Sequence, residues 1–231
     1  MSKNKHKKTH TDLECVQEGF ANGVAPNFPL SDEQKWDMVD NAEKAYGEFL
    51  DALGCNWRED PNSSDTPRRV AKAYVFDLWK GRYELPTDIT SFPSDGYEGI
   101  VLERDIPIVS MCSHHHQAIL GKAHVAYIPG KEGKVVGLSK LNRIVEHFAR
   151  RGAIQEQLTV AIHNAVNTVC EDNVGVMVLV HSFHNCVSCR GVKHFGASMV
   201  TSEVSGVFAD HTRTAKAEVL EMLKLGMEGY R

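Results

Sequence analysis

The sequence predicts an α+β fold, in which a four-stranded antiparallel sheet is covered by helices on one face and carries a helical appendage at its N-terminal end. Two observations predict it. Apolar residues recur at helical spacing between residues 31 and 80, whereas runs rich in Val and Ile from Ile100 onward are typical of strands. After Ile100 the expected order is two strands, two helices, two strands and one helix. Paired strands separated by paired helices favour an antiparallel sheet under a helical layer.

The first hundred residues divide into a tail and a helical region. Residues 1–30 mix charge, Gly, Asn and Pro without periodicity, so we expect a flexible tail there. Residues 31–99 form the expected helical region, and Ser31 opens it with the Ser-x-x-Gln spacing of a capping box. The elements expected in this region are a helix that ends near residue 53, a helix from residue 66 to 80, and a loop from residue 83 to 99.

Residues 100–231 form the expected catalytic domain. Its helices and strands follow from the change in apolar period, with Ser139 as the candidate N-cap of the first helix. The expected elements are strands 100–109 and 119–128, two helices on either side of Gly152, strands 174–184 and 192–207, and a helix from 210 to about 225. A four-stranded sheet leaves two edges exposed, and such edges often join between subunits, so we expect a homo-oligomer.

Composition restricts the class of protein. The chain has 231 residues, of which 42% are hydrophobic and 24% charged, as in ordinary globular proteins. A formal net charge of -4 argues against nucleic acid as a partner but allows a local cationic pocket. The basic N-terminus lacks the apolar stretch of a signal peptide, and the longest apolar run, residues 174–180, is too short to span a bilayer. Six scattered cysteines predict reduced thiols, and we expect a cytoplasmic protein with no membrane partner.

Two short stretches are rich in metal-binding side chains. Cys112 and His115 stand three residues apart, which places them on the same side of a turn, and His184 and Cys186 are expected to leave a strand side by side. Cys112, His115 and Cys186 would give three ligands and an open position, as in catalytic zinc sites. Cys189 leaves an alternative, because a fourth cysteine or histidine ligand would make the metal structural.

Several cationic side chains could hold an anion. They are Arg69 in the second helix, Lys140 and Arg143 in the first turn of the third, and Arg190 just after the cysteine pair. Helix N-termini favour anions because their backbone amides are unpaired. Taken singly, each of these residues is better explained as a surface charge. Glu156 could accept two hydrogen bonds from a guanine base, or it could be an ordinary first-turn carboxylate.

At this point several motifs match a known family in the same order along the chain. They are Cys112-Ser113-His114-His115, the run from Gly121 to Pro129, the run from Gly137 to Val145, the run from Gln155 to Thr159, and His184-x-Cys186-x-x-x-Arg190-Gly191. From about Asp65 to its C-terminus the chain closely resembles GTP cyclohydrolase I. The resemblance implies a tunnelling fold (T-fold) assembled into a homodecamer, with the active site between subunits. It also implies hydrolysis of GTP at C8, release of formate, and formation of 7,8-dihydroneopterin triphosphate for folate, pterin or 7-deazaguanine synthesis.

The resemblance also implies roles for individual positions of this chain. Zinc would be bound by Cys112, His115 and Cys186. His114 and His184 would be the catalytic imidazoles, and Ser139 would handle the ribose. The triphosphate would be held by Arg69, Lys140, Arg143 and Arg190, and guanine would be read by Gln155 and Glu156.

Three positions depart from the family's motif. Ser113 replaces a usual glutamate, so a carboxylate beside the metal is absent. His116 stands where the family has an apolar residue and is an alternative ligand, and Cys189 replaces a small residue. Two other functions stay open: a nitrile reductase of the same fold, which fits the residues from Gly137 to Lys140 less well, and a catalytically silent paralogue that binds zinc or GTP in a regulatory or structural role.

Overall fold

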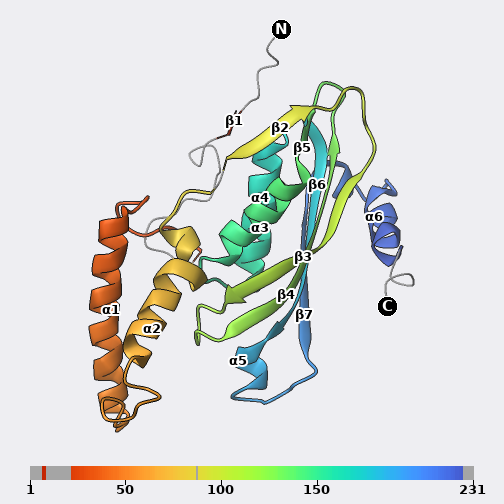
Figure 1. The fold of residues 1–231 in the computed structure, drawn as a ribbon. Helices are drawn as coiled ribbons and strands as arrows, with labels where there is room; N and C mark the ends of the chain where they lie inside the picture. The colour runs from red at the N-terminus through yellow and green to blue at the C-terminus, as the bar shows by residue number, and fades with distance from the viewer. Residues whose placement is uncertain (1–6, 9–21, 87, 226–231) are drawn as a thin grey trace.

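The computed structural model describes residues 7–8, 22–86 and 88–225, and Figure 1 shows their arrangement. A helical pair stands beside a layered body made of a sheet and two helices. The prediction of a mixed fold of helices and antiparallel strands is confirmed. Among the described residues, no helix is both long enough and apolar enough to cross a membrane.

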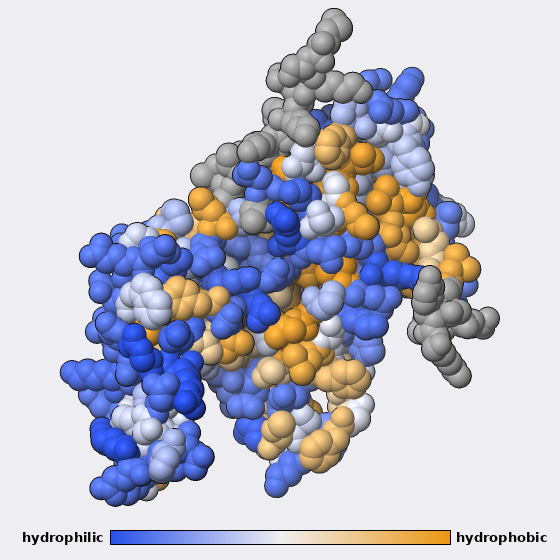
Figure 2. Space-filling model, in the orientation of Figure 1, coloured by the Kyte–Doolittle hydropathy of each residue, from blue (hydrophilic) through white to orange (hydrophobic). Residues whose placement is uncertain are grey.

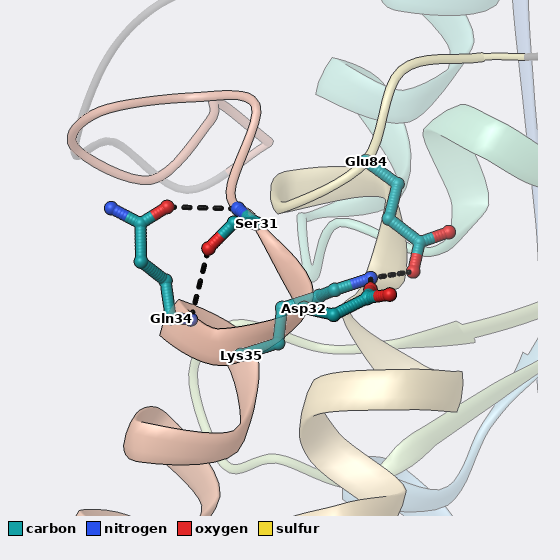
Figure 3. A network of polar contacts seen from close by, with 5 residues as sticks. All are labelled: Ser31, Asp32, Gln34, Lys35 and Glu84. Atoms are coloured by element: carbon teal, nitrogen blue, oxygen red, sulfur yellow. Dashed lines mark hydrogen bonds and ion pairs between the residues drawn. The ribbon is translucent and has the colours of Figure 1, made fainter.

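The helical pair consists of α1 (Asp32–Ala52) and α2 (Thr66–Ala73), and α2 continues into a π-helical turn, η2 (Tyr74–Leu78), and a 3-10 turn, η3 (Lys80–Arg82). The capping box is confirmed, because the Ser31 hydroxyl accepts from the Gln34 amide and the Gln34 side chain accepts from the Ser31 amide (Figure 3). Lys35 then reaches from α1 to Glu84, with 3.0 Å between Nζ and Oε1, and fixes the start of α1 to the segment after η3.

The main sheet has the strand order β3-β4-β6-β7, and every neighbouring pair is antiparallel. Its strands are β3 (Val101–Met111), β4 (Ala118–Pro129), β6 (Asn173–His184) and β7 (Ser198–Val204). The apolar face of this sheet packs against α3 (Leu138–Ala149) and α4 (Gln155–Val169), which together form the largest buried cluster. β6 lies between β4 and β7, and its C-terminal end carries the chain from this core to one end of the sheet.

The opposite face of the sheet also carries helical structure, which corrects the expectation of helices on one face alone. There α6 (Ala215–Lys224) and a 3-10 turn, η4 (Gly206–Phe208), bury Val219 and Phe208 against Ala126 and Met177. The rest of that face keeps large apolar side chains exposed. One row crosses three strands in register, and its members are Val109, Leu120 and Phe183. Figure 2 shows apolar surface gathered over the sheet side, whereas the surface around α1 is mostly hydrophilic.

A second, small sheet was not expected. It joins β1 (Lys7–Lys8), β2 (Ile89–Pro93) and β5 (Lys134–Val136), so the expected loop of residues 83–99 contains a strand. The expected tail, residues 1–30, lies mostly outside the described residues. Its last part is packed, since Val24 is 2% exposed and the Ala25 amide donates to the Arg82 carbonyl.

Two C-terminal elements are shorter than expected. β7 begins at Ser198 rather than at residue 192, because the backbone first forms a turn: the Lys193 amide donates to the Arg190 carbonyl, and Lys193 has a φ angle of 55°. The last helix begins at Ala215 rather than at residue 210. There the Asp210 carboxylate accepts from the amide and hydroxyl of Thr212 and forms a turn before the helix.

Candidate active site

The central strand β6 carries His184 out of the core at the point where the strand ends. Alternate residues of a strand share a face, and on β6 this face consists of fully buried valines followed by Ser182 and His184. The valines are Val176, Val178 and Val180. Since α4 covers the same face, His184 emerges beside the first turn of α4.

Gln155, the first residue of α4, is fully buried and fixed by the sheet. Its Nε2 donates to the carbonyl oxygen of Val180 at 3.1 Å, to that of Met199 at 3.2 Å, and to Thr201 Oγ1 at 3.0 Å. These three acceptors identify the nitrogen of the amide, so Oε1 must point the other way. That oxygen lies 2.7 Å from His184 Nε2 and also accepts from the Ser182 hydroxyl.

The contact with Gln155 determines the tautomer of His184. An amide oxygen can only accept, so Nε2 of His184 carries a proton and donates it to Gln155. Nδ1 is then the nitrogen left for other chemistry. Burial lowers the pKa of His184, and the charge of Glu156 partly opposes this effect. Because of these hydrogen bonds the side chain of Gln155 faces His184 and the sheet, whereas the next residue, Glu156, is exposed.

The turn between β3 and β4 carries the other cluster. Its two ends are closed by backbone hydrogen bonds, from Cys112 N to Gln117 O and from His116 N to Cys112 O, each 2.9 Å long. Cys112 is 4% exposed, while His114 and His115 project from the turn and are exposed. Their rings lie edge to face, with centroids 6.3 Å apart.

Cys186 faces Cys112 across the site, but it does not lie on a strand as expected. β6 ends at His184, and Cys186 lies in a short helical turn, α5 (Asn185–Ser188). Burial raises the pKa of the Cys186 thiol, and a hydrogen bond with the Cys112 thiol raises it further. Just beyond α5, Arg190 donates to His115 Nε2 over 2.9 Å. The structure thus brings Cys112, Cys186, His115 and Arg190 together from stretches about seventy residues apart.

The chemical types of the donor side chains at this site suit a zinc ion. Thiolate and imidazole are the ligands that zinc prefers, and three of them leave a position for substrate or water. Two of the three donors, Cys112 and Cys186, already lie in contact. The Nε2 lone pair of His115 is directed at Arg190, and within the described part of the chain no three Cys, His, Asp or Glu side chains stand in metal-binding geometry. His115 would therefore have to exchange Arg190 for a metal.

The expected anion-binding residues on α3 lie elsewhere. The helix begins at Leu138 with Gly137 as its N-cap, so Ser139 lies within the first turn and is not the cap. Arg143 lines a surface pocket of about 120 Å³ with Lys80, at the junction of α3 and η3. Among the residues that the structure describes, no hydrogen bond or ion pair joins Ser139, Lys140 or Arg143 to the cysteine cluster.

Arg69 lies on the helical pair. It pairs at 3.1 Å with Asp65, the residue that precedes α2, and lines an open pocket of about 410 Å³ with Arg68 and Lys72. The described contacts of Arg69 do not include the cluster of Cys112 and Cys186. Arg69 and the α3 residues thus form separate cationic areas on the surface of one chain.

Two residues of the site were missed in the sequence. Ser182 and Thr201 hold Gln155 from β6 and β7. The signal for Ser182 was present, because it is a polar residue on an otherwise apolar strand face, two positions before His184. Nothing in the local sequence of β7 indicated Thr201, since its partner is 46 residues away.

Comparison with known proteins decides the family. The sequence model described as GTP cyclohydrolase I matches residues 42–224, which is more than half of the chain. The chain belongs to the GTP cyclohydrolase I family. GTP cyclohydrolase 1 of Geobacillus kaustophilus is 46% identical over 180 residues, which cover 76% of this chain and 92% of the relative. GTP cyclohydrolase 1 of Bacillus subtilis is 45% identical over 186 residues, which cover 79% and 94%.

The GTP cyclohydrolase I match includes both halves of the candidate site. The Cys112 turn, the start of α4, the end of β6 and α5 all lie inside residues 42–224. α2 and α3, which carry the two separate cationic areas, also lie inside it.

Proposed function

We propose that this protein is a zinc-dependent GTP cyclohydrolase I that opens GTP at C8, releases formate and forms 7,8-dihydroneopterin triphosphate. The product would enter folate, pterin or 7-deazaguanine synthesis. The activity rests on membership of the family and on relatives named GTP cyclohydrolase 1 that match over nearly their whole length. The observation that carries the chemistry is the meeting of the Cys112 and Cys186 thiols next to a histidine whose tautomer is fixed.

Cys112, His115 and Cys186 would hold the zinc ion. When bound, zinc would supply a Lewis acid and lower the pKa of a water molecule toward neutrality. Arg190 would give up its hydrogen bond to His115 if His115 held the metal, and its guanidinium would then be available for the triphosphate. Ser113 adds no carboxylate to this site, so the hydrogen bonds around the ligands come from other groups.

His184 moves the proton at guanine N7. Its Nε2 stays bonded to Gln155, so Nδ1 takes up and delivers the proton. Burial keeps the pKa of His184 low, which favours the neutral imidazole near pH 7 and its return to that state after each proton transfer. His114, exposed on the facing turn, would act as the second imidazole in the later ring opening and reclosure, with Ser139 at the ribose.

The guanine base is assigned to Glu156. Its exposed carboxylate can accept from N1–H and from the exocyclic amine of guanine. We assign the Gln155 side chain to His184 rather than to guanine, because its nitrogen and oxygen already have partners in the buried network. Gln155 would then orient the proton carrier, while Glu156 selects the base.

We assign the triphosphate to cations from more than one copy of the chain. Arg190 lies at the cysteine cluster, whereas Lys140, Arg143 and Arg69 lie in the separate areas on α3 and α2. A homo-oligomer with active sites between subunits, as in a decamer of T-folds, would bring these cations to one substrate. The exposed apolar row on the sheet supports such an assembly, as do the outer edges of β3 and β7, which pair with no strand among the described residues.

The location and organisation follow as further proposals. Thiols that bind zinc must stay reduced, which favours a cytoplasmic protein with neither membrane nor nucleic acid as a partner. The helical region of residues 31–99 has a small apolar cluster of its own, centred on Val39 and Val75. This supports a distinct helical region before a catalytic domain of residues 100–231, to which β2 is joined by its pairing with β5.

One incubation tests the proposal. Purified protein is mixed with GTP, formate and the fluorescent oxidised pterin are measured, and bound metal is determined in the same sample. We expect formate and pterin in equal amounts, loss of both on chelation and recovery with Zn²⁺. His184→Asn should abolish turnover, whereas His211→Asn, an exposed histidine outside the site, serves as the control. Undiminished turnover in metal-free protein would contradict the zinc role, and zinc bound without formate release would identify a silent paralogue.

A further inference from the structure

His116, the last residue of the turn between β3 and β4, has an unusual backbone and an unusual environment. Its φ angle is 50°, in the left-handed region that residues other than glycine seldom adopt. Its amide nevertheless closes the turn by donating to the carbonyl of Cys112. The position of Cys112 and His115 therefore depends on His116 keeping this conformation.

The imidazole of His116 reaches across to η2 in the helical region. Its Nδ1 is hydrogen-bonded to the Tyr74 hydroxyl over 3.3 Å. The ring also lies edge to face with Trp79, with centroids 5.1 Å apart and an interplanar angle of 75°. Burial raises the pKa of Tyr74, so its hydroxyl stays protonated and can donate. His116 therefore has partners other than the two thiols.

Trp79 is itself held in place from the other side. Gly152 has a φ of 72°, and a Cβ added there would lie 2.5 Å from Trp79 Nε1, so the glycine backbone lies directly against the indole. The next residue, Ala153, donates to the carbonyl of Met111, the last residue of β3 before the turn. Tyr74 and Trp79 contact each other edge to face at 5.0 Å. A chain of contacts thus runs from the α3–α4 connection through Trp79 to His116.

We propose that His116 is a positioning residue that ties the turn of residues 112–116 to Tyr74 and Trp79, so that Cys112 and His115 face Cys186. The inference rests on the proposed metal role of these three residues. Ring contacts to η2 offset the unfavourable left-handed backbone of His116 and hold the turn in one geometry. The helical region then contributes to the metal site without supplying a ligand.

Cobalt(II) is a suitable probe, because thiolate coordination to cobalt gives an absorption band that reports on the metal and its geometry. Metal-free protein is titrated with Co²⁺, and kcat and KM for GTP are measured separately on the zinc form. Three variants test the contacts. Tyr74→Phe removes one hydroxyl, His116→Phe keeps a flat ring, and His116→Gly relieves the left-handed backbone while it removes the ring. Tyr97→Phe is the matched control, because it removes a tyrosine hydroxyl that donates to Ile100 O, far along the chain from the turn.

We expect Tyr74→Phe to weaken Co²⁺ binding by about 2- to 10-fold, as for loss of one hydrogen bond. His116→Gly should weaken it by about 10- to 100-fold and shift the cobalt bands, as for loss of an outer-shell partner. kcat should fall in the same order, with KM for GTP held within about 2-fold because the substrate contacts are untouched. Tyr97→Phe should behave as the wild type.

Two outcomes would overturn this inference alone. Wild-type cobalt binding by His116→Gly would show that the ring positions nothing. A cobalt spectrum of His116→Phe in which the thiolate band remains but the ligand-field bands show one nitrogen ligand fewer, with Tyr74→Phe unchanged, would show that His116 is itself a ligand. A wild-type protein that binds no Co²⁺ through thiolates would instead overturn the proposed function, and this inference with it.

Discussion

Replacement of Gln155 by leucine distinguishes a role in orienting His184 from a role in binding guanine. Leucine has a similar volume and keeps the buried site filled, but it removes the acceptor of His184 Nε2 and the donor to Val180, Met199 and Thr201. If Gln155 orients His184, the substitution slows the proton transfer and therefore lowers kcat. One hydrogen bond has a net value of about 0.5–1.5 kcal/mol, which converts to roughly a 2- to 13-fold lower kcat. Complete loss of the proton transfer would cost about 10²- to 10⁴-fold.

The assay is steady-state kinetics of formate release from GTP on zinc-loaded protein. We expect kcat to fall by at least about 2- to 13-fold, and by as much as about 10²- to 10⁴-fold if the proton transfer is lost, while KM changes by less than about 3-fold because Glu156 still reads the base. Thr168→Val is the control, since it removes one side-chain hydrogen bond at the other end of the same helix. A raised KM with unchanged kcat would refute this reasoning and return Gln155 to a role in binding guanine.

Three further predictions concern the scaffold. Gly152→Ala should lower the free energy of unfolding by about 2–5 kcal/mol in urea titrations, because alanine is strained at φ 72° and its Cβ meets Trp79; an unchanged midpoint would contradict this. Ser31→Ala should cost about 0.5–2 kcal/mol by loss of the capping box, seen as a lower melting temperature that Ser31→Asp largely restores. Burial raises the pKa of Tyr127 to about 12, so its neutral form stabilises the fold below pH ~10 and this contribution is lost between about pH 10 and 12. Tyr127→Phe should therefore unfold with a shallower pH dependence in that range, and identical pH profiles would exclude the effect.

Much of the layered body could be predicted because its signals are local. α4 and β6 have clear apolar periods, and the Ser31 capping box depends on only four consecutive residues. β2 escaped prediction because Ile89–Pro93 is a short stretch that ends in proline. It becomes a strand through pairing with β5, more than forty residues further on. The placement of α6 on the second face of the sheet likewise depends on packing of Val219 against Met177, which no local pattern reveals.

The candidate site was predictable in its residue types and less so in its geometry. Clustering of cysteine and histidine at 112–116 and 184–190 indicated a metal, and Cys112 and Cys186 do meet. The orientation of the Gln155 amide could not be predicted, because it is set by carbonyl oxygens of β6 and β7 that only the folded sheet brings together. Nor could the contact of His116 with Tyr74, since these residues are 42 positions apart.

The position of β6 in the sheet has a consequence for how motion is distributed over the site. Its backbone pairs with β4 as far as His184 and with β7 as far as Phe183, so its amides should exchange with solvent only when the sheet opens. The four-residue turn α5 begins immediately afterwards and, in the described residues, lies outside the strand pairing of the sheet. The border between slowly and rapidly exchanging backbone thus falls between His184 and Cys186, two residues apart. A ligand that binds both His184 and Cys186 would slow amide exchange in α5 and leave exchange in β6 unchanged. The His184 imidazole is therefore fixed in place before the ligand binds, whereas the Cys186 thiol becomes fixed on binding.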